Sequence, residues 1–560
     1  MHSNFYRFAA VIAAAGLLAS CAPPAPPPPT DAQLEAAAAA ITIDDMREMI
    51  IEMSDDRYKG RAPGSEGDKM ATDYISQRLE AIGAQPSGDD GTWLQKFELV
   101  GLNAQQPDSW SFTTPNGEKS YTVLEDYVIS SGRQEDSVGV EDAELVFVGF
   151  GIQAPEYDWD DFKGADLKGK VLVVLNNDPD WDPELFEGNR RLYYGRWSYK
   201  YESAARAGAI GAIIIHTRPS AGYGWEVVRN SWSGMQFELP DDGSAPLMQI
   251  EAWVTEPVAR DLIQAAGQDL DTLVELAKSR DFSPVPLGVT TTLSMPVEME
   301  RTASANVLGV LPGTDKADEY VVLTAHHDHM GENDAAGDED GIYNGARDNA
   351  SGTAGVIAVA KALAELQPAP RRSILIALVG AEEQGLLGSK FLAAYPPVPA
   401  GKLAALLNVD APNVYGPTAD IAQVGKGKSG DLDRAVESAA QRQGRTEVKG
   451  DTEPTQGLYY RSDHFSLAKV GVPGIYLKMG EDFNGSDAEA EKARAKEYNA
   501  KHYHQPSDEY DPKWNLEGLR LDMQLVFYAG VELANMEALP AWNPGDEFEA
   551  ARMEAIEAAK

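Results

Sequence analysis

The stretch YVVLTAHHDH, from Tyr320 to His329, decides the fold class of this 560-residue chain. Its first six residues form an almost continuous apolar run, which is typical of a strand buried on both faces of a sheet. The four residues that follow, starting at His326, can all bind a metal ion or a polar ligand. In open α/β sheets, ligands bind beyond the carboxyl ends of the strands. The stretch therefore predicts such a sheet, with a functional site where this strand ends.

Two further apolar runs end in the same way. Residues 373–380 lead to Glu382 and Glu383, and residues 403–409 lead to Asp410. Apolar residues recur at helical spacing between the three runs, over 351–366 and 386–395. This alternation predicts an α/β fold with a mainly parallel, twisted sheet sandwiched by helices. Because parallel strands end at one edge of their sheet, we expect the three polar groups to converge there.

Composition and charge limit the possible classes of protein. Hydrophobic residues make up 43% of the chain and aromatic residues 8%, which is normal for a globular enzyme and too rich for disorder. The length predicts two or three domains. The formal net charge is −40, and nucleic-acid binding needs a cationic surface. We therefore expect no nucleic-acid partner.

The N-terminal sequence predicts export and a lipid anchor. Arg7 precedes an apolar run, Phe8 to Leu18, that is too short to span a bilayer. The run leads to LASC (18–21), which resembles a bacterial lipoprotein signal peptide whose cleavage leaves Cys21 as the lipidated N-terminus. The spacer APPAPPPPT (22–30) is an extended, proline-rich segment. By resemblance to sorted lipoproteins, the absence of Asp at position 22, which is Ala22, favours the outer membrane, facing the periplasm. The alternative is an ordinary secretory signal with an incidental cysteine.

The histidines point to a metal. Six of the eight lie between 326 and 504, and imidazole with carboxylate is the ligand mixture that zinc prefers at catalytic sites. Asp348 lies in GARDNASG (345–352), directly before a predicted helix. It could serve as the helix N-cap. Asn349 or Ser351 could equally do so, which would leave Asp348 for another role.

Several motifs now define a family resemblance. They are GRAPGSEG (60–67), AHHDHMG (325–331), GARDNASGTA (345–354), AEEQGLLGS (381–389), NVD (408–410), RSDHF (461–465) and YHQPSDEYD (503–511). In this order they resemble the family of co-catalytic dizinc exopeptidases, which includes bacterial leucine-type aminopeptidases and glutamate carboxypeptidase II. The resemblance spans most of residues 45–540, interrupted in the middle.

The resemblance implies two zinc ions per chain and a set of five ligands. His326 and Asp410 would bind one ion, Glu383 and His504 would bind the other, and Asp348 would bridge both. Two zinc ions that share a water lower its pKa towards neutrality and supply a hydroxide that bridges the metals. Three ligand carboxylates and neutral imidazoles nearly balance the charge of two such ions.

The resemblance also implies roles around the metals. Glu382 would be the general base, and Asp328 would orient His326 without binding metal. Arg461 and Tyr503 would contact the substrate or the tetrahedral intermediate. The alternatives are a surface salt bridge for Arg461 and a packed aromatic ring for Tyr503. The chain departs from the family at Arg347, where an acidic residue is frequent.

The middle of the chain resembles a different module. DLKGKVLVV (166–174), followed by SAARAGAIGAIII (203–215), is similar to the protease-associated domain. We expect six parts in the chain: a lipoprotein signal peptide (1–21), a Pro/Ala-rich linker (22–40), the N-terminal part of the peptidase domain (41–109), an inserted β-rich protease-associated domain (110–290), the zinc peptidase domain (291–540) and an acidic tail (541–560).

The function that follows is removal of N-terminal amino acids from peptides by a zinc-dependent aminopeptidase. A carboxypeptidase or dipeptidase with the same two-zinc site is the first alternative, because the same ligands serve both reactions. Glutaminyl cyclase shares the fold but works with a single zinc. A non-catalytic binding lipoprotein is the last alternative, although both the base and the ligands are present. The sequence does not indicate the preferred side chain, the role of the insert or the oligomeric state.

Overall fold

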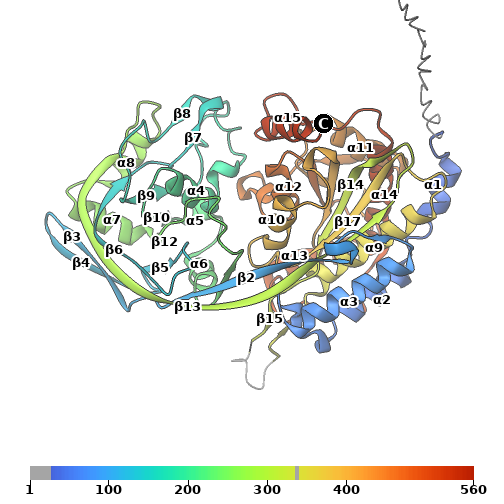
Figure 1. The fold of residues 1–560 in the computed structure, drawn as a ribbon, viewed down its shortest axis with the longest axis horizontal. Helices are drawn as coiled ribbons and strands as arrows, with labels where there is room; N and C mark the ends of the chain where they lie inside the picture. The colour runs from blue at the N-terminus through green and yellow to red at the C-terminus, as the bar shows by residue number, and fades with distance from the viewer. Residues whose placement is uncertain (1–26, 334–339) are drawn as a thin grey trace, which may run out of the picture.

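The computed structural model describes residues 27–333 and 340–560 and has two lobes, each built around a β-sheet (Figure 1). The strand β13 (Val285–Leu311) runs through both lobes. Its first half pairs with β6 (Ser137–Phe147) in one sheet, and its second half pairs with β2 (Leu94–Ala104) in the other. A single long strand therefore joins the two sheets.

The first sheet carries the predicted site. Its main strands, in spatial order, are β2, β13, β17 (Arg372–Val379), β14 (Lys316–His326), β18 (Leu403–Val409), β21 (Gly474–Met479), β19 (Asp420–Val424) and β20 (Glu447–Lys449), and the short strands β1 (Gln85–Pro86) and β11 (Gln236–Glu238) pair with β13 and β2. The four central strands, β17, β14, β18 and β21, are parallel to one another. The predicted α/β fold with a mainly parallel sheet is confirmed.

Helices cover both faces of this sheet, because alternate side chains of each strand point to opposite faces. In β14, Val321 and Leu323 belong to one apolar core, and Val322 belongs to another. The first core is closed by α1 (Asp31–Ala38), α2 (Ile43–Met53), α3 (Glu66–Ala81), α9 (Gly352–Glu365), α11 (Gly430–Arg442) and α14 (Glu517–Asn535). The second core is closed by α10 (Leu387–Ala394) and α12 (His464–Lys469). The α15 helix (Glu549–Ala558) reaches the start of β18, where Arg552 donates a hydrogen bond to the carbonyl of Leu403.

The second lobe is richer in β-structure. Its sheet contains β3 (Ser109–Thr114), β4 (Gly117–Thr122), β5 (Tyr127–Ser130), β6, β9 (Val171–Leu175), β10 (Gly211–His216), β12 (Ile250–Thr255) and the first half of β13. Its longest helices are α4 (Trp197–Arg206), α7 (Glu256–Ala265) and α8 (Leu270–Ala277). The α4 helix begins at Trp197, and Tyr199 and Tyr201 lie on its buried face.

The membrane prediction rests on residues that the structure leaves undescribed. The expected signal peptide and Cys21 lie outside the described residues. Within 27–333 and 340–560, no helix has both the length and the apolar character that a membrane crossing requires.

Candidate active site

The polar residues predicted at the strand ends converge at the carboxyl edge of the parallel strands. His326 is the last residue of β14, Asp410 directly follows β18, and Glu382 and Glu383 follow β17. Asp348 joins them from the loop before α9. His504 joins from the segment after α13 (Ala488–Lys501). Parallel topology brings the first four together, and two loops supply the others.

Asp348 lies at the centre of the cluster, between two imidazoles. Its Oδ1 is 3.2 Å from His326 Nε2, and its Oδ2 is 3.4 Å from His504 Nε2. His326 Nε2 is also 3.4 Å from Asp410 Oδ1, and His504 Nε2 is 3.2 Å from Glu383 Oε2. Two sets, each with one histidine and one further carboxylate, therefore share Asp348. All five residues expected to bind metal lie together.

The chemistry of this donor set fits divalent cations. Ligand atoms of His326, Asp348 and Glu383 all lie within 4.8 Å of one another, as do those of His326, Glu382 and Asp410. Burial lowers the pKa of His326, but the neighbouring carboxylates outweigh it and raise that pKa well above its usual value. Crowded, buried carboxylates repel one another unless a positive charge lies between them. Imidazole and carboxylate together are the ligand mixture of catalytic zinc sites.

Asp328 lies between His326 and the backbone of the two glutamates. Its Oδ1 accepts a hydrogen bond from the backbone N–H of Glu382 at 3.0 Å, and its Oδ2 accepts one from Glu383 at 3.3 Å. The same Oδ1 lies 3.7 Å from His326 Nδ1, which is too long for a hydrogen bond. Asp328 therefore faces the far side of the His326 ring, and it also fixes the backbone that carries both glutamates.

Glu382 has a different environment from the other carboxylates. Its side chain is partly buried and makes no hydrogen bond with any residue that the structure describes. Burial raises its pKa well above the usual value, and the charges of Glu383 and Asp410 add to this, whereas His326 opposes it. A carboxylate that is raised in pKa and unbonded can accept a proton from a reactant.

Two further residues, one from each of two motifs, also touch the donor set. His329 Nδ1 lies 2.7 Å from Glu383 Oε1, and Ser462 Oγ donates a hydrogen bond to Asp410 Oδ2 at 2.7 Å. Both belong to motifs that carry the family resemblance, AHHDHMG and RSDHF. His329 was already among the four polar residues that follow the first apolar run, whereas the position of Ser462 in its motif was the only signal for that residue in the sequence.

Asp508 fixes the loop that carries Asp348. Its two carboxylate oxygens accept hydrogen bonds from the backbone N–H groups of Arg347 and Asp348, at 3.1 and 3.0 Å, and from the hydroxyl of Tyr498 at 2.9 Å. Asn349 Oδ1 accepts a hydrogen bond from Gly352 N at 3.0 Å. Asn349 therefore satisfies the start of α9, which leaves Asp348 free to face both imidazoles.

Arg347 departs from the family pattern without disturbing this loop. Its guanidinium donates hydrogen bonds to the carbonyls of Pro412 and Ala411, at 3.1 and 3.0 Å. It also lies 4.2 Å from the centre of the Tyr498 ring. The side chain is thus held by backbone oxygens and an aromatic face, so it needs no acidic partner.

Of the two residues expected to contact substrate, Tyr503 packs on the donor set and Arg461 is next to it in sequence only. The ring of Tyr503 stacks on His504, with 3.8 Å between ring centres, and its side chain is 48% exposed. Arg461 directly precedes Ser462, the residue that hydrogen-bonds Asp410. Contact of either residue with a substrate stays a prediction.

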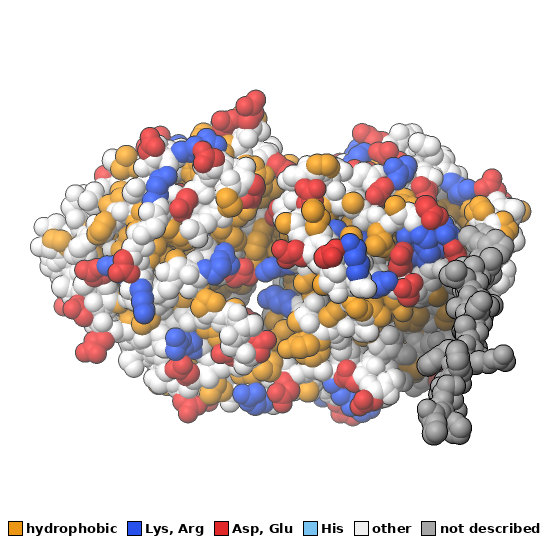
Figure 2. All heavy atoms as spheres, turned by 45° about the horizontal axis from the view of Figure 1, so that its top comes forward, with side chains coloured by type: hydrophobic (Ala, Val, Ile, Leu, Met, Phe, Trp, Pro, Cys, Tyr) orange, Lys and Arg blue, Asp and Glu red, His pale blue; other side chains and the backbone are white. Residues whose placement is uncertain are grey.

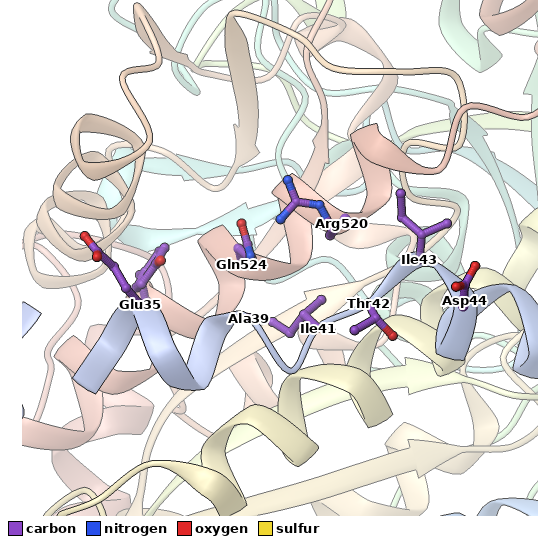
Figure 3. A pocket seen from close by; sticks show the side chains of 9 residues that line it. Glu35, Ala39, Ile41, Thr42, Ile43, Asp44, Arg520 and Gln524 are labelled. Atoms are coloured by element: carbon purple, nitrogen blue, oxygen red, sulfur yellow. The ribbon is translucent and has the colours of Figure 1, made fainter. Parts of the chain in front are cut away.

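A surface pocket of about 480 Å³ lies elsewhere in the molecule. Figure 3 shows it between the α1–α2 connection and α14, with Ile41, Thr42 and Gln524 among the residues that line it. None of the metal-site residues lines this pocket. This pocket is therefore separate from the candidate metal site.

Comparison with known proteins finds a family match over part of the chain. The family model described as peptidase family M28 matches residues 306–526, which include β14, β17, β18 and every residue of the donor set. Over these residues the chain is similar to peptidase family M28.

Individual relatives are similar over shorter segments. A probable glutamate carboxypeptidase, LAMP1, from Arabidopsis thaliana is 30% identical over 200 residues, 32% of this chain and 26% of the relative. Aminopeptidase NAALADL1 from Mus musculus is 35% identical over 108 residues, 19% of this chain and 13% of the relative. The chain thus spans about a quarter or less of the length of these curated relatives.

One solved structure shares the fold over nearly its whole length. The aminopeptidase from Aneurinibacillus sp. strain AM-1 superimposes with a TM-score of 0.52 at 19% identity, covering 91% of this chain and 97% of that chain. At this identity the likeness concerns the fold alone.

Proposed function

We propose that the protein is a zinc-dependent exopeptidase that binds two metal ions and removes N-terminal amino acids from peptides. The observation that carries the proposal is the position of Asp348, with one oxygen facing His326 and the other facing His504. A carboxylate that faces two separate imidazole–carboxylate sets is suited to bridge two metal ions. The family match and the aminopeptidases among its relatives support the same class of reaction.

The residues fall into two groups: the metal ligands and one general base. His326 and Asp410 would hold one zinc ion, His504 and Glu383 the other, and Asp348 both. When bound, zinc acts as a Lewis acid that lowers the pKa of a water molecule and polarises the scissile carbonyl. Glu382 takes a proton from the attacking water on its carboxylate and returns it to the leaving amine. Asp328 keeps Glu382 and Glu383 in place through their backbone N–H groups.

A panel of paired substrates tests the proposal. We would use dipeptides and aminoacyl-p-nitroanilides, each with a free and an N-acetylated terminus, and count zinc on the same sample. The expected result is chelator-sensitive cleavage of the free-amine compounds only, with about two zinc ions per chain. Failure to cleave any free-amine compound while metal is bound would overturn the aminopeptidase assignment.

A carboxypeptidase or dipeptidase is the second candidate. Arg461 directly precedes Ser462 and has no acidic partner among the described residues, and a free cation is suited to the carboxylate terminus of a peptide. One relative is named a probable glutamate carboxypeptidase. Cleavage of N-acetylated peptides, with no cleavage of their C-terminal amides, would favour this reading.

We also propose that the protein is lipid-anchored at Cys21 and faces the periplasm from the outer membrane. The support is the LASC sequence (18–21), behind the apolar run and ahead of the proline-rich spacer. Replacing Cys21 by Ser removes the thiol that carries the lipid. In a bacterial expression host, the Cys21→Ser variant is expected in the soluble fraction and the unmodified protein in the membrane fraction. Equal distribution of the two would contradict the anchor.

A further inference from the structure

Three buried polar atoms lie next to the strand ends that carry the metal site, and none has a hydrogen-bond partner among the described residues. They are Oδ1 of Asp68 on α3, Oγ of Ser304 on β13 and Nδ1 of His327, which directly follows β14. All three residues are at most 6% exposed. Charged side chains are spread over the face drawn in Figure 2, where solvent satisfies their hydrogen bonds, but these three residues lie below the surface.

The three side chains lie close together although they come from three different elements. Oδ1 of Asp68 is 3.7 Å from Nδ1 of His327. A Cβ added to Gly380 would lie 2.8 Å from Oγ of Ser304 and 3.2 Å from Cε1 of His327, so the hydroxyl and the ring flank the same glycine. Burial raises the pKa of Asp68 to about 6, and the Gly64 N–H and the nearby Ser304 hydroxyl oppose this rise. At neutral pH Asp68 is therefore an ionised carboxylate beside Ser304 and His327.

Other contacts fix the hydrogen-bond roles of two of these atoms. Nε2 of His327 lies 3.1 Å from the carbonyl oxygen of Ala305. A carbonyl oxygen only accepts, so Nε2 carries the proton and Nδ1 of the neutral ring is an acceptor. Oδ2 of Asp68 accepts from the Gly64 N–H at 2.8 Å, and Oδ1 is an acceptor as well. Two acceptors thus face each other at a distance too long for a direct hydrogen bond, even if one of them gained a proton.

A group that satisfies both acceptors must donate two hydrogen bonds, and water is the smallest molecule that does so. Its hydrogens would go to Asp68 Oδ1 and His327 Nδ1, and its oxygen would accept from the Ser304 hydroxyl. Buried water molecules typically make about three such bonds to polar groups that otherwise have no partner. A zinc ion fits less well, because structural zinc sites use four ligands from cysteine, histidine and acidic residues.

The three atoms adjoin the backbone that carries the candidate metal site. His327 lies between His326, an expected zinc ligand, and Asp328, whose carboxylate accepts the N–H of Glu382 at 3.0 Å. The N–H of His327 donates to the carbonyl of Val379, the last residue of β17, at 2.9 Å. A shift of the His327 ring therefore moves the backbone on both sides of it, including the residue that would bind zinc.

We propose that a buried water molecule binds between Asp68, Ser304 and His327, and that Asp68 acts through it as a positioning residue for the metal site. The inference rests on the proposed two-metal exopeptidase function. The water joins α3 and β13 to the end of β14 and so fixes the direction in which His326 points. Asp68 touches neither metal nor substrate, and its effect is on how tightly zinc is held. Outer contacts of this kind change metal affinity by about 10- to 100-fold.

A crystal structure of the zinc-loaded protein, at a resolution that shows ordered water, tests the first half of the proposal. The expected result is a density peak about 2.8 Å from Asp68 Oδ1, His327 Nδ1 and Ser304 Oγ, the usual length of such hydrogen bonds. A peak at about 2.0–2.2 Å from the same atoms would identify a metal ion instead. Either that result or the absence of a peak would overturn the proposal.

Variants of Asp68 test its positioning role. Asp68→Ala removes the contact with the water. Asp68→Asn keeps it, because the amide oxygen accepts the Gly64 N–H and the amide nitrogen donates to the water, which still donates to His327. Asp73→Asn is the matched control, since Asp73 lies on the same helix but is exposed and ion-paired with Lys69. Zinc affinity is measured by competition with a chelator, and stability by urea unfolding of the zinc-free proteins.

Asp68→Ala should bind zinc about 10-fold more weakly than the unmodified protein. Asp68→Asn should restore the affinity, and Asp73→Asn should leave it unchanged. If Asp68→Ala does not fold, Ser304→Ala replaces it, because it removes one bond to the water and no other hydrogen bond of the described residues. That variant should also weaken zinc binding.

Two outcomes with the variants would overturn the positioning role. Loss of stability in Asp68→Ala without any change in zinc affinity would make Asp68 a purely structural residue. Equal weakening in Asp68→Asn and Asp68→Ala would show that the negative charge matters and the water contact does not. Failure of the proposed function is a separate result, because a zinc-loaded protein that cleaves no peptide would still give the water position and the zinc affinities.

Discussion

Glu382 differs from its neighbours because it is held by its backbone and not by its side chain. Asp328 accepts the Glu382 N–H at 3.0 Å, while the Glu382 carboxylate makes no hydrogen bond with the described residues. Adjacent Glu383, by contrast, contacts both His329 and His504. The side chain of Glu383 is thus fixed in the donor set, whereas the carboxylate of Glu382 is available to accept and return a proton.

Replacing Glu382 by Gln tests this division at the level of one atom. The amide keeps the shape of the side chain but cannot accept a proton, so we expect kcat to fall by about 10²- to 10⁴-fold, the usual contribution of a general base. Bound zinc, measured by atomic absorption, should stay unchanged. Glu365→Gln, at the exposed end of α9, is the control and should keep full activity. An active Glu382→Gln enzyme would place the base elsewhere.

His464 provides a residue-scale prediction about pH. It is fully buried, and burial lowers its pKa to about 3. An unfolded histidine has a pKa of about 6.5, so between these values the unfolded chain binds the extra proton. The contribution of His464 to the free energy of unfolding is therefore fully present above about pH 6.5. It is lost as the pH falls towards 3, by up to about 1.4 kcal/mol per pH unit.

Chemical denaturation between pH 7 and pH 5, in the presence of a chelator, checks the sign. The His464→Gln variant should lose less stability over this interval than the unmodified protein. His502→Gln, which alters a histidine bonded to Ser507 at the surface, should lose as much as the unmodified protein. Parallel pH dependence in all three proteins would rule out the His464 contribution.

At the scale of elements, Arg61 ties three separate segments together under the site. Its guanidinium is fully buried and donates hydrogen bonds to four backbone carbonyls: His327 at 2.7 Å, Met53 at 2.5 Å, Asn344 at 2.7 Å and Gly345 at 3.0 Å. It thereby joins the end of α2, the loop after β14 and the loop before α9. His326 directly precedes the loop after β14, and Asp348 lies in the loop before α9.

Arg61→Lys keeps the charge but replaces a planar fork of five donors with a single ammonium group. Because several carbonyls would lose their partners, we expect the free energy of unfolding to fall by about 3 kcal/mol and zinc to bind more weakly. Urea denaturation and competition with a chelator measure the two effects. Arg57→Lys, an exposed and ion-paired arginine nearby, should change stability by less than about 0.5 kcal/mol. Unchanged zinc affinity in Arg61→Lys would show that the loops are held by other contacts.

At the scale of the whole molecule, the two lobes share both a strand and a core. The β13 strand pairs in both sheets. One apolar core contains Leu185 and Leu192 of the second lobe together with Tyr459 and Phe465 of the first. An ion pair between Glu202 and Lys469, at 3.2 Å, adds to the same boundary. Neither lobe can unfold without exposing part of this shared core.

We therefore expect a single cooperative transition when the protein is heated. Differential scanning calorimetry and circular dichroism should give the same single midpoint of thermal unfolding. Phe465→Ala, which removes a buried ring at the boundary, should lower that midpoint without splitting the transition. Two separate transitions in the unmodified protein would show that the lobes unfold independently.

The sequence by itself determined the parallel sheet and its edge. Apolar runs such as 403–409 are buried on both faces. A continuous run of apolar residues predicts this burial from the local sequence alone. The polar residue at the end of each run, for example His326 or Asp410, follows directly from the same pattern. The family motifs supplied the rest of the donor set, including Asp348 and His504, without showing how their atoms face one another.

Only the tertiary structure decided which distant residues support this site. Asp508 bonds the backbone of Asp348, Arg61 joins loops far apart in the chain, and Asp68 faces His327. The spacing of apolar residues in the sequence does not predict such contacts. They depend on how complete elements and lobes pack against one another and not on local burial. The physical reason is that hydrogen-bond partners and charges act over a few ångströms of space, whatever their separation along the chain.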